Sequence, residues 1–175
     1  MNLTLRLVDA AERLFDRHGY MATGMDQLTR AAGMSSRTLY KHAGSKAQLM
    51  AAVLAERDRR FLRQIEVSSV EALFAALAGW IRDEGARGCL FLRSRAETGG
   101  DIPEIADAVA AHKTALRQRV AGIVAADLGA APDPLLVDQV LVLVEGATHA
   151  AVTLGPEAVE AARSAAAVLV AQARA

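Results

Sequence analysis

The sequence contains a single cysteine, few aromatic residues and no net charge, and each of these shortages excludes a class of protein. Cys89 has no partner cysteine in the chain, which excludes an internal disulfide and a cysteine metal site. A reducing, cytoplasmic location is therefore expected. Aromatic residues make up 4% of the chain and hydrophobic residues 53%, so the apolar content is mostly Ala, Leu and Val. These side chains favour closely packed helices over a β-sandwich.

Membrane and enzyme signals are also missing. No run of consecutive apolar residues approaches the roughly 18 of a membrane span, and no basic-then-apolar leader opens the chain. The sequence has no H-E-x-x-H, no G-x-S-x-G and no Gly-rich phosphate loop. A helical di-metal site needs Glu-x-x-His twice, whereas Glu145 and His149 have the wrong spacing and occur once. We expect no catalytic residue, no cofactor, no metal and no membrane partner.

The zero net charge conceals an uneven distribution along the chain. Residues 1–63 carry 11 Lys and Arg against 6 Asp and Glu, whereas the remainder carries 9 against 14. A basic N-terminal third beside an acidic remainder is expected when one module meets phosphate and the other does not. The charge pattern therefore predicts nucleic acid as a partner of the N-terminal part. The basic run over residues 57–63 is expected to be a solvated face, with a role in holding DNA as the alternative.

Apolar periodicity and capping signals predict an all-α fold of about nine helices with no convincing strand. The first helix covers residues 3–18, and Thr23 and Asp26 are expected to cap a second helix that ends at Ala32. Capping boxes at Ser45 and Ser68 start later helices. The remaining helices are expected over residues 35–42, 45–65, 68–84, 89–98, 101–128, 133–154 and 155–175.

Residues 25–43, MDQLTRAAGMSSRTLYKHA, have the pattern of a helix-turn-helix. Such a motif needs a glycine at the bend, which Gly33 supplies, and apolar anchors on both helices, among them Leu28 and Leu39. The second helix must present polar side chains to base edges and phosphates. It does so almost without interruption, with Ser35, Ser36, Arg37, Thr38, Tyr40, Lys41 and His42.

The segment Leu3–Leu49 resembles the DNA-binding domain of the TetR (tetracycline-repressor) family of transcriptional regulators. The matching pieces are AAERLFDRHGY, the turn just described, and TLYKHAGSK. The spacing of Tyr40, His42 and Lys46 is similar to the family's signature, in which these positions face the DNA backbone. The segment GCLFLRSRAETG, over residues 88–99, also resembles one found in some members of the family.

This resemblance implies a sequence-specific, DNA-binding transcriptional regulator, with repression released by an unidentified small-molecule effector as the family default. It implies a helix-turn-helix DNA-binding domain at residues 1–46 and a helical effector-binding and dimerisation domain at residues 47–175. The homodimer is expected to bind a palindromic operator in double-stranded DNA. Two alternatives stay open. One is a helical ligand-binding protein or enzyme with an incidental basic head, and the other is a non-specific architectural DNA-binding protein.

Residue chemistry assigns roles within the helix-turn-helix. Ser36 and Arg37 lie near the start of the recognition helix, where base edges are reached, and Arg suits guanine. Thr38 and Lys41 suit either a base or a phosphate. The phosphate contacts that fix the register are expected from Tyr40, His42, Lys46 and the helix that Thr23 caps.

The sequence departs from the family pattern at two positions. Ala43 stands where an aromatic residue usually follows the histidine, so an anchor between the recognition helix and the next helix is lost. We expect this junction to be mobile, with room for a larger side chain. Thr29 stands where Ala is usual, and its hydroxyl can bond back to the preceding turn at small cost.

The C-terminal helices are candidates for the dimer interface. The helix that begins near Leu135 is apolar nearly all round and must be covered from two sides. Four such helices, two from each chain, would form a bundle whose interface residues are expected to be Val140, Val144, Ala147, Ala151, Ala162, Ala166 and Leu169.

The resemblance also implies an effector pocket within the middle helices, from about Ala72 to Leu128. Its expected lining residues are Trp80, Phe91, Arg95, His112, Leu116 and His149. Packing in the hydrophobic core is the alternative explanation for the aromatic residues among them.

Overall fold

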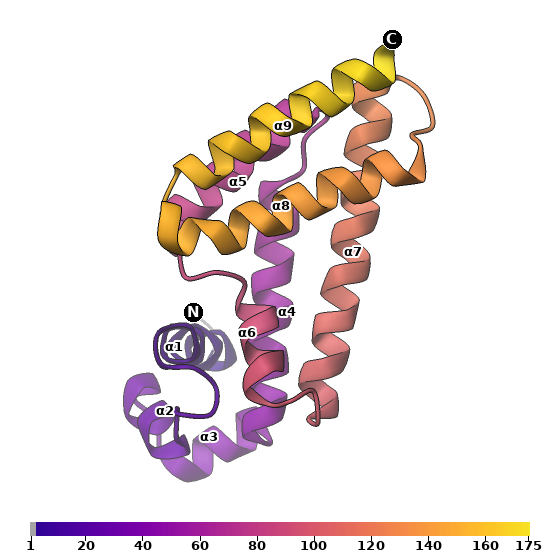
Figure 1. Ribbon diagram of the computed structural model, residues 1–175. Helices are drawn as coiled ribbons and strands as arrows, with labels where there is room; N and C mark the ends of the chain where they lie inside the picture. The colour runs from indigo at the N-terminus through magenta and orange to yellow at the C-terminus, as the bar shows by residue number, and fades with distance from the viewer. Residues whose placement is uncertain (1–2) are drawn as a thin grey trace. The chain divides into compact units, whose positions relative to one another are not determined.

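The computed structural model describes residues 3–175, and this part of the chain forms nine helices and no strand (Figure 1). The predicted all-α fold is therefore confirmed. The helices are α1 (Leu3–His18), α2 (Met25–Ala32), α3 (Ser36–Ala43), α4 (Lys46–Gln64), α5 (Val70–Glu84), α6 (Leu90–Glu97), α7 (Pro103–Leu128), α8 (Pro134–Leu154) and α9 (Glu157–Arg174).

Side-chain caps explain where several of these helices begin. At the start of α4, the Ser45 hydroxyl accepts from the Gln48 N–H and the Gln48 side chain accepts from the Ser45 N–H, both at 3.0 Å. The predicted capping box is thus present, and it satisfies two N–H groups that have no partner within the helix. Asp133 caps α8 in the same way, because its carboxylate accepts from the Leu135 N–H at 2.9 Å.

The cap of α5 lies one residue later than predicted. The Ser69 hydroxyl, rather than that of Ser68, accepts from the Ala72 N–H at 3.1 Å. Glu71, the expected partner in a capping box, instead accepts from Arg163 of α9 at 2.7 Å. Both serines suit the cap chemically, so the sequence pattern alone does not separate them.

The helices group into two compact units, each with its own buried core. Unit 1 contains the chain up to Asp58 together with Leu90–His112, and unit 2 contains Arg59–Cys89 and Lys113–Ala175. This division differs from the predicted boundary at residue 46. The reason is that α4 is continuous from Lys46, and its first half packs with α1 rather than starting a separate domain.

Unit 1 is held by apolar packing and by two ion pairs to α1. Leu7, Ala11 and Phe15, spaced four residues apart on α1, are at most 1% exposed. On the same helix Glu12 accepts from Arg57 of α4 at 2.7 Å, and both side chains are buried. The Arg57 side chain is therefore not part of a solvated face, which corrects the interpretation of the basic run at this position.

Helix α6 is attached to the end of α1 by two of its side chains. Arg93 donates to the Asp16 carboxylate at 2.5 Å and to the Asp16 carbonyl at 3.1 Å. One turn later on α6, Glu97 accepts from the Met21 N–H at 2.9 Å. These bonds place a segment from the middle of the sequence within unit 1.

Unit 2 has a core of Leu, Val, Ile and Phe side chains from α5, α7, α8 and α9. Helices α8 and α9 lie side by side, joined by a short turn at Gly155, and α5 packs on both (Figure 1). Among the described residues, α8 alone is long and apolar enough to cross a membrane, with a mean hydropathy of 1.5 over its most apolar window. Polar residues, among them Asp138, Gln139 and Glu145, interrupt the apolar residues of α8, so the helix contains no consecutive apolar run of that length. A core helix of a water-soluble bundle has the same composition.

The residues predicted for the dimer interface are mostly buried within the single chain. Val140, Val144, Ala147, Ala151, Ala162 and Ala166 are all at most 7% exposed, and Leu169 is half-buried. Six of the seven belong to the core of unit 2. They pack α8 and α9 within one chain, so the packing of a single chain accounts for their burial, and their part in a dimer interface stays a prediction.

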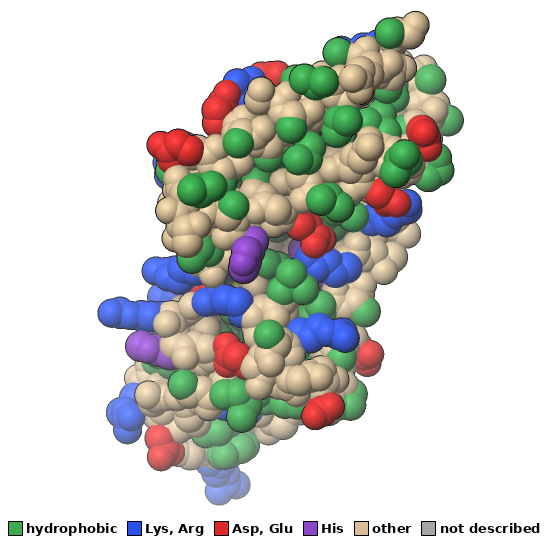
Figure 2. Space-filling model, in the orientation of Figure 1, with side chains coloured by type: hydrophobic (Ala, Val, Ile, Leu, Met, Phe, Trp, Pro, Cys, Tyr) green, Lys and Arg blue, Asp and Glu red, His purple; other side chains and the backbone are tan. Residues whose placement is uncertain are grey.

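The exposed parts of these two helices carry large apolar side chains among polar residues such as Asp138 and His149. Figure 2 shows hydrophobic side chains spread over the region of α8 and α9. The exposed large side chains on the two helices are Leu135, Val142, Val152, Leu154 and Val168, which are 50–69% exposed. We call this set the α8–α9 apolar face.

Candidate nucleic-acid interface

The bend between α2 and α3 is made by Gly33. Its φ of +63° lies in the left-handed region that L side chains rarely adopt. The Gly33 N–H donates to the Arg30 carbonyl at 3.2 Å, and the Met34 N–H donates to the Thr29 carbonyl at 3.1 Å. These two bonds satisfy carbonyls at the end of α2 and turn the chain sharply.

The start of α3 is stabilised by hydroxyl groups. The Ser35 side chain accepts from the Thr38 N–H at 3.2 Å and lies 2.9 Å from the Thr38 hydroxyl. Two of the residues predicted to contact DNA therefore also fix the first turn of the recognition helix.

Leucines fix the rotation of α2 and α3 about their axes. Leu28 and Leu39 are both fully buried, and Ala32 and Ala43 are at most 8% exposed. Because α3 buries Leu39 and Ala43, four residues apart, its other positions point outward. Exposed residues on α3 are Ser36, Arg37, Tyr40, Lys41 and His42.

This outward face of α3 is basic and carries an exposed aromatic ring. Helices α2 and α3 together contain three basic residues, Arg30, Arg37 and Lys41, and one acidic residue, Asp26. Tyr40 is 52% exposed, although a ring of its size is usually buried or in contact with a partner. A cationic, hydroxyl-bearing face on a short helix is chemically suited to phosphates and base edges.

Thr23 does not lie on this surface, which corrects the prediction made for it. Its side chain is fully buried, and its hydroxyl donates to the Gly19 carbonyl at 2.7 Å. The residue that caps α2 is Gly24, whose N–H donates to the Gln27 side chain at 2.8 Å. The sequence signal for this cap is the glutamine three residues after Gly24.

Lys46 is held near α1 at the start of α4. Its amine lies 4.4 Å from the centre of the Tyr20 ring, within the range of a cation–π contact. Burial lowers the pKa of Lys46 from its ordinary value, while the carboxylate of Glu97 acts in the opposite direction. Burial, with a smaller contribution from Glu104, raises the pKa of Tyr20. His42 is anchored separately, with its Nδ1 3.3 Å from the Thr4 hydroxyl.

The six residues predicted to line an effector pocket lie in different surroundings. In unit 1, His112 is buried, hydrogen-bonded to Asp58 at 2.7 Å and stacked on Phe91 with ring centres 3.8 Å apart. Arg95 is exposed.

In unit 2, Leu116 is in the core, His149 is exposed, and Trp80 packs edge-on against Phe61 at 5.1 Å. The aromatic residues are therefore explained by packing.

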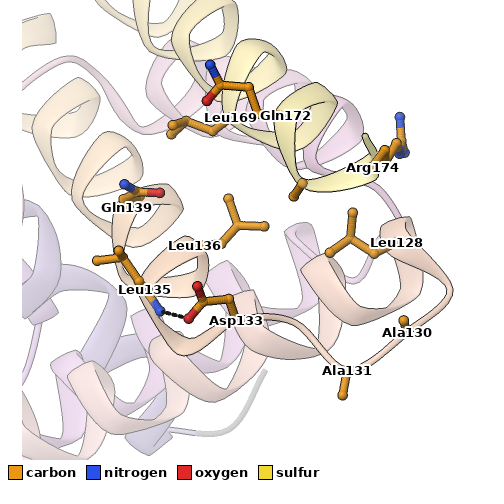
Figure 3. A pocket seen from close by; sticks show the side chains of 11 residues that line it. Leu128, Ala130, Ala131, Asp133, Leu135, Leu136, Gln139, Leu169, Gln172 and Arg174 are labelled. Atoms are coloured by element: carbon orange, nitrogen blue, oxygen red, sulfur yellow. Dashed lines mark hydrogen bonds between the residues drawn. The ribbon is translucent and has the colours of Figure 1, made fainter.

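Unit 2 contains a cavity that is lined by none of the six predicted residues. It has a volume of about 630 Å³ and is formed by the end of α7, the start of α8 and the end of α9 (Figure 3). Four leucines, Leu128, Leu135, Leu136 and Leu169, supply apolar walls. Gln139 of α8 and Gln172 of α9 also line it, as do the charged residues Asp133 and Arg174 (Figure 3). Sequence periodicity does not reveal this cavity, because its walls come from the ends of three helices.

Comparison with known proteins supports the DNA-binding assignment of unit 1. A family model described as bacterial regulatory proteins, tetR family, matches residues 7–53. This stretch contains α2, α3 and the bend between them. An uncharacterized HTH-type transcriptional regulator of Mycobacterium tuberculosis is 31% identical over 115 residues, which are 61% of this chain and 57% of that protein. The chain thus matches little more than half the length of that relative.

Solved structures extend the similarity to the whole chain. A TetR-family transcriptional regulator from Streptomyces coelicolor superposes with a TM-score of 0.87 at 26% identity, covering 99% of this chain and 96% of that chain. A putative regulator of the same family from Streptomyces avermitilis gives a TM-score of 0.81 at 24% identity, covering 99% and 98%. Both the helix-turn-helix and the helical remainder therefore have counterparts of the same fold.

Proposed function

Because the chain belongs to the TetR family of bacterial regulators, we propose that it regulates transcription by binding DNA through the exposed face of α3. The observation that carries this proposal is the division of α3 between two faces. Leu39 and Ala43 are buried against unit 1, whereas Ser36, Arg37, Tyr40 and Lys41 are exposed. A short helix with this division can enter the major groove without losing its packing.

The roles within the proposed surface follow from side-chain chemistry. Arg37 has a planar guanidinium that can pair with the O6 and N7 atoms of guanine, and Ser36 lies beside it at the start of α3. Tyr40, Lys41, His42 and Lys46 are assigned to phosphates, which fix the register of the protein on the duplex. Ser35 and Thr38 remain candidates for contact in addition to their capping bonds.

We propose that the active form is a homodimer joined through the α8–α9 apolar face. An exposed apolar face on two neighbouring helices is typical of a protein–protein contact. A second copy of the same face would cover both by two-fold symmetry. Two recognition helices about one DNA turn apart would then match a palindromic operator.

The proposal includes a small-molecule effector that binds the cavity of unit 2. Its four leucines, together with two glutamine amides and the charged side chains of Asp133 and Arg174, suit an amphipathic molecule that has both apolar and polar groups. Ligand-released repression is the family default, so we propose that the effector lowers the affinity for DNA. We propose no enzymatic activity for this chain, and we expect it to be located in the cytoplasm.

A gel-shift titration tests the proposal against its two alternatives. The probe is the DNA upstream of the protein's own gene, with excess non-specific competitor, and the matched variants are Arg37→Ala and Arg82→Ala. Arg82 is an exposed arginine on α5 and serves as the control. We expect a competitor-resistant complex that Arg37→Ala weakens and Arg82→Ala retains. No complex would support a ligand carrier or an enzyme, and binding without sequence preference would support an architectural protein.

A further inference from the structure

Unit 1 contains a cavity that shares one residue, His42, with the proposed DNA-binding surface. It has a volume of about 320 Å³ and lies where α1, the end of α3 and the start of α4 meet. Ala43 borders it from α3, Leu7 and Val8 from α1, and Leu49 from α4. We call it the Ala43 cavity, because the short side chain of Ala43 leaves this space open.

The Ala43 cavity has an apolar floor and an exposed rim that includes Thr4, His42 and Gln48. Leu7, Val8, Ala43 and Leu49 are each at most 8% exposed, so their other sides pack against the core of unit 1. An apolar floor beneath a polar rim accepts an apolar ring that carries a polar group. The volume lies at the lower end of the range for ligand sites, about 300–1,000 Å³, which corresponds to one or two fused rings.

The polar groups of the cavity specify an uncharged ligand. None of the residues that line it is Lys, Arg, Asp or Glu. A charged ligand would therefore lose its hydration without gaining a counter-ion. Three lining residues, Thr4, His42 and Gln48, have polar side chains, and the Thr4 hydroxyl lies 3.3 Å from the His42 Nδ1. The Thr4 hydroxyl or the His42 ring can accept a hydrogen bond from a ligand hydroxyl or ring N–H.

We propose that the Ala43 cavity binds a small, uncharged aromatic molecule of one or two rings that carries one hydroxyl or ring N–H. The ring fills the space beside Ala43 and contacts α1, α3 and α4 together. Its binding stabilises the junction between the recognition helix and α4, since these contacts exist only when all three helices are in place. The site shares no lining residue with the cavity of unit 2.

Indole binding to the full chain tests this site. In methyl spectra recorded by NMR, the methyl groups of Leu7, Val8 and Leu49 are expected to shift along saturable curves as indole is added. At an indole concentration ten times its Kd, the midpoint of thermal unfolding is expected to rise by about 3–6 °C. The absence of a saturable shift, up to the solubility of indole, would overturn the proposal.

Filling the cavity provides the matched controls. Ala43→Phe and the smaller Ala43→Leu are both expected to abolish the methyl shifts, so the test survives if one of them does not fold. Ala55→Phe places the same ring at an exposed position of α4 outside the cavity and is expected to bind indole as the parent does. Undiminished binding by both folded Ala43 variants, or shifts confined to methyl groups of unit 2, would show that indole binds elsewhere and would refute the site.

Discussion

Val142→Glu separates the proposed dimer contact from the fold, because Val142 is 69% exposed in the single chain. A glutamate there remains hydrated in the monomer, so the free energy of unfolding of one chain should change by less than about 0.5 kcal/mol. In the dimer the same side chain would be covered by the second copy. The substitution should therefore produce a folded monomer.

The size of the effect follows from the area still open to solvent. Full burial of a valine contributes about 1.5–3 kcal/mol, so the exposed part of Val142 contributes about 1–2 kcal/mol for each copy. The two copies lose about 2–4 kcal/mol, and burying two carboxylates without partners adds several kcal/mol more. A total above about 4 kcal/mol raises the Kd of the dimer at least about a thousandfold.

Sedimentation velocity over a range of concentrations, with circular dichroism on the same samples, measures both quantities. Ala147→Glu is the contrasting variant: Ala147 is 3% exposed within one chain, so its carboxylate should unfold unit 2 rather than release a monomer. Ala75→Glu, on the exposed side of α5, is the neutral control. A Val142→Glu protein that remains dimeric at nanomolar concentration would refute the α8–α9 apolar face as the contact.

The other predictions concern unit 1. Arg37→Ala should relax preference at one base pair and cost about 1–3 kcal/mol in binding to operator variants; an equal loss on every variant would instead assign Arg37 to phosphate. Lys46→Ala should weaken binding to all sequences and lower the salt slope by about one unit, and an unchanged slope would contradict its phosphate role. Glu12→Gln removes the charge of Glu12 from its buried ion pair with Arg57 and should lower the free energy of unfolding in urea by about 3–5 kcal/mol; a loss below about 1 kcal/mol would mean that this ion pair contributes little to stability. Ala43→Phe should slow hydrogen exchange across residues 33–46, whereas slow exchange already present in the parent would show that the junction is rigid without the ring.

Local chemistry made much of the fold predictable. The Ser45 capping box, the Asp133 cap and the bend at Gly33 each depend on residues within four positions of one another, so they can be recognised in the sequence. The buried Leu28 and Leu39 were predictable as anchors for the same reason.

The predictions from sequence were less accurate where the same residues allow more than one structural arrangement. Thr23 has the side chain of a good cap, but the Gly24–Gln27 bond caps α2 one residue later and leaves Thr23 in the core. On α8, apolar residues surround most of the helix, so periodicity does not distinguish the face that packs within the chain from the face left open. The ion pair of Arg57 with Glu12 joins residues 45 positions apart, a separation that no local pattern reports.

The attachment of α6 to α1 limits how the recognition helix can be transplanted. A Cβ at Gly19 would lie 2.7 Å from the Glu97 carboxylate, the same group that accepts from the Met21 N–H. Positions 19 and 97 therefore constrain each other although they are far apart in the chain. A chimera in which residues 7–53 come from a relative keeps a helix-turn-helix. It is compatible with this α6 only if the relative has a glycine at position 19 and, at position 16, a carboxylate that Arg93 can reach. The portable module is thus not a contiguous stretch of sequence, and a specificity graft should carry α6 with it.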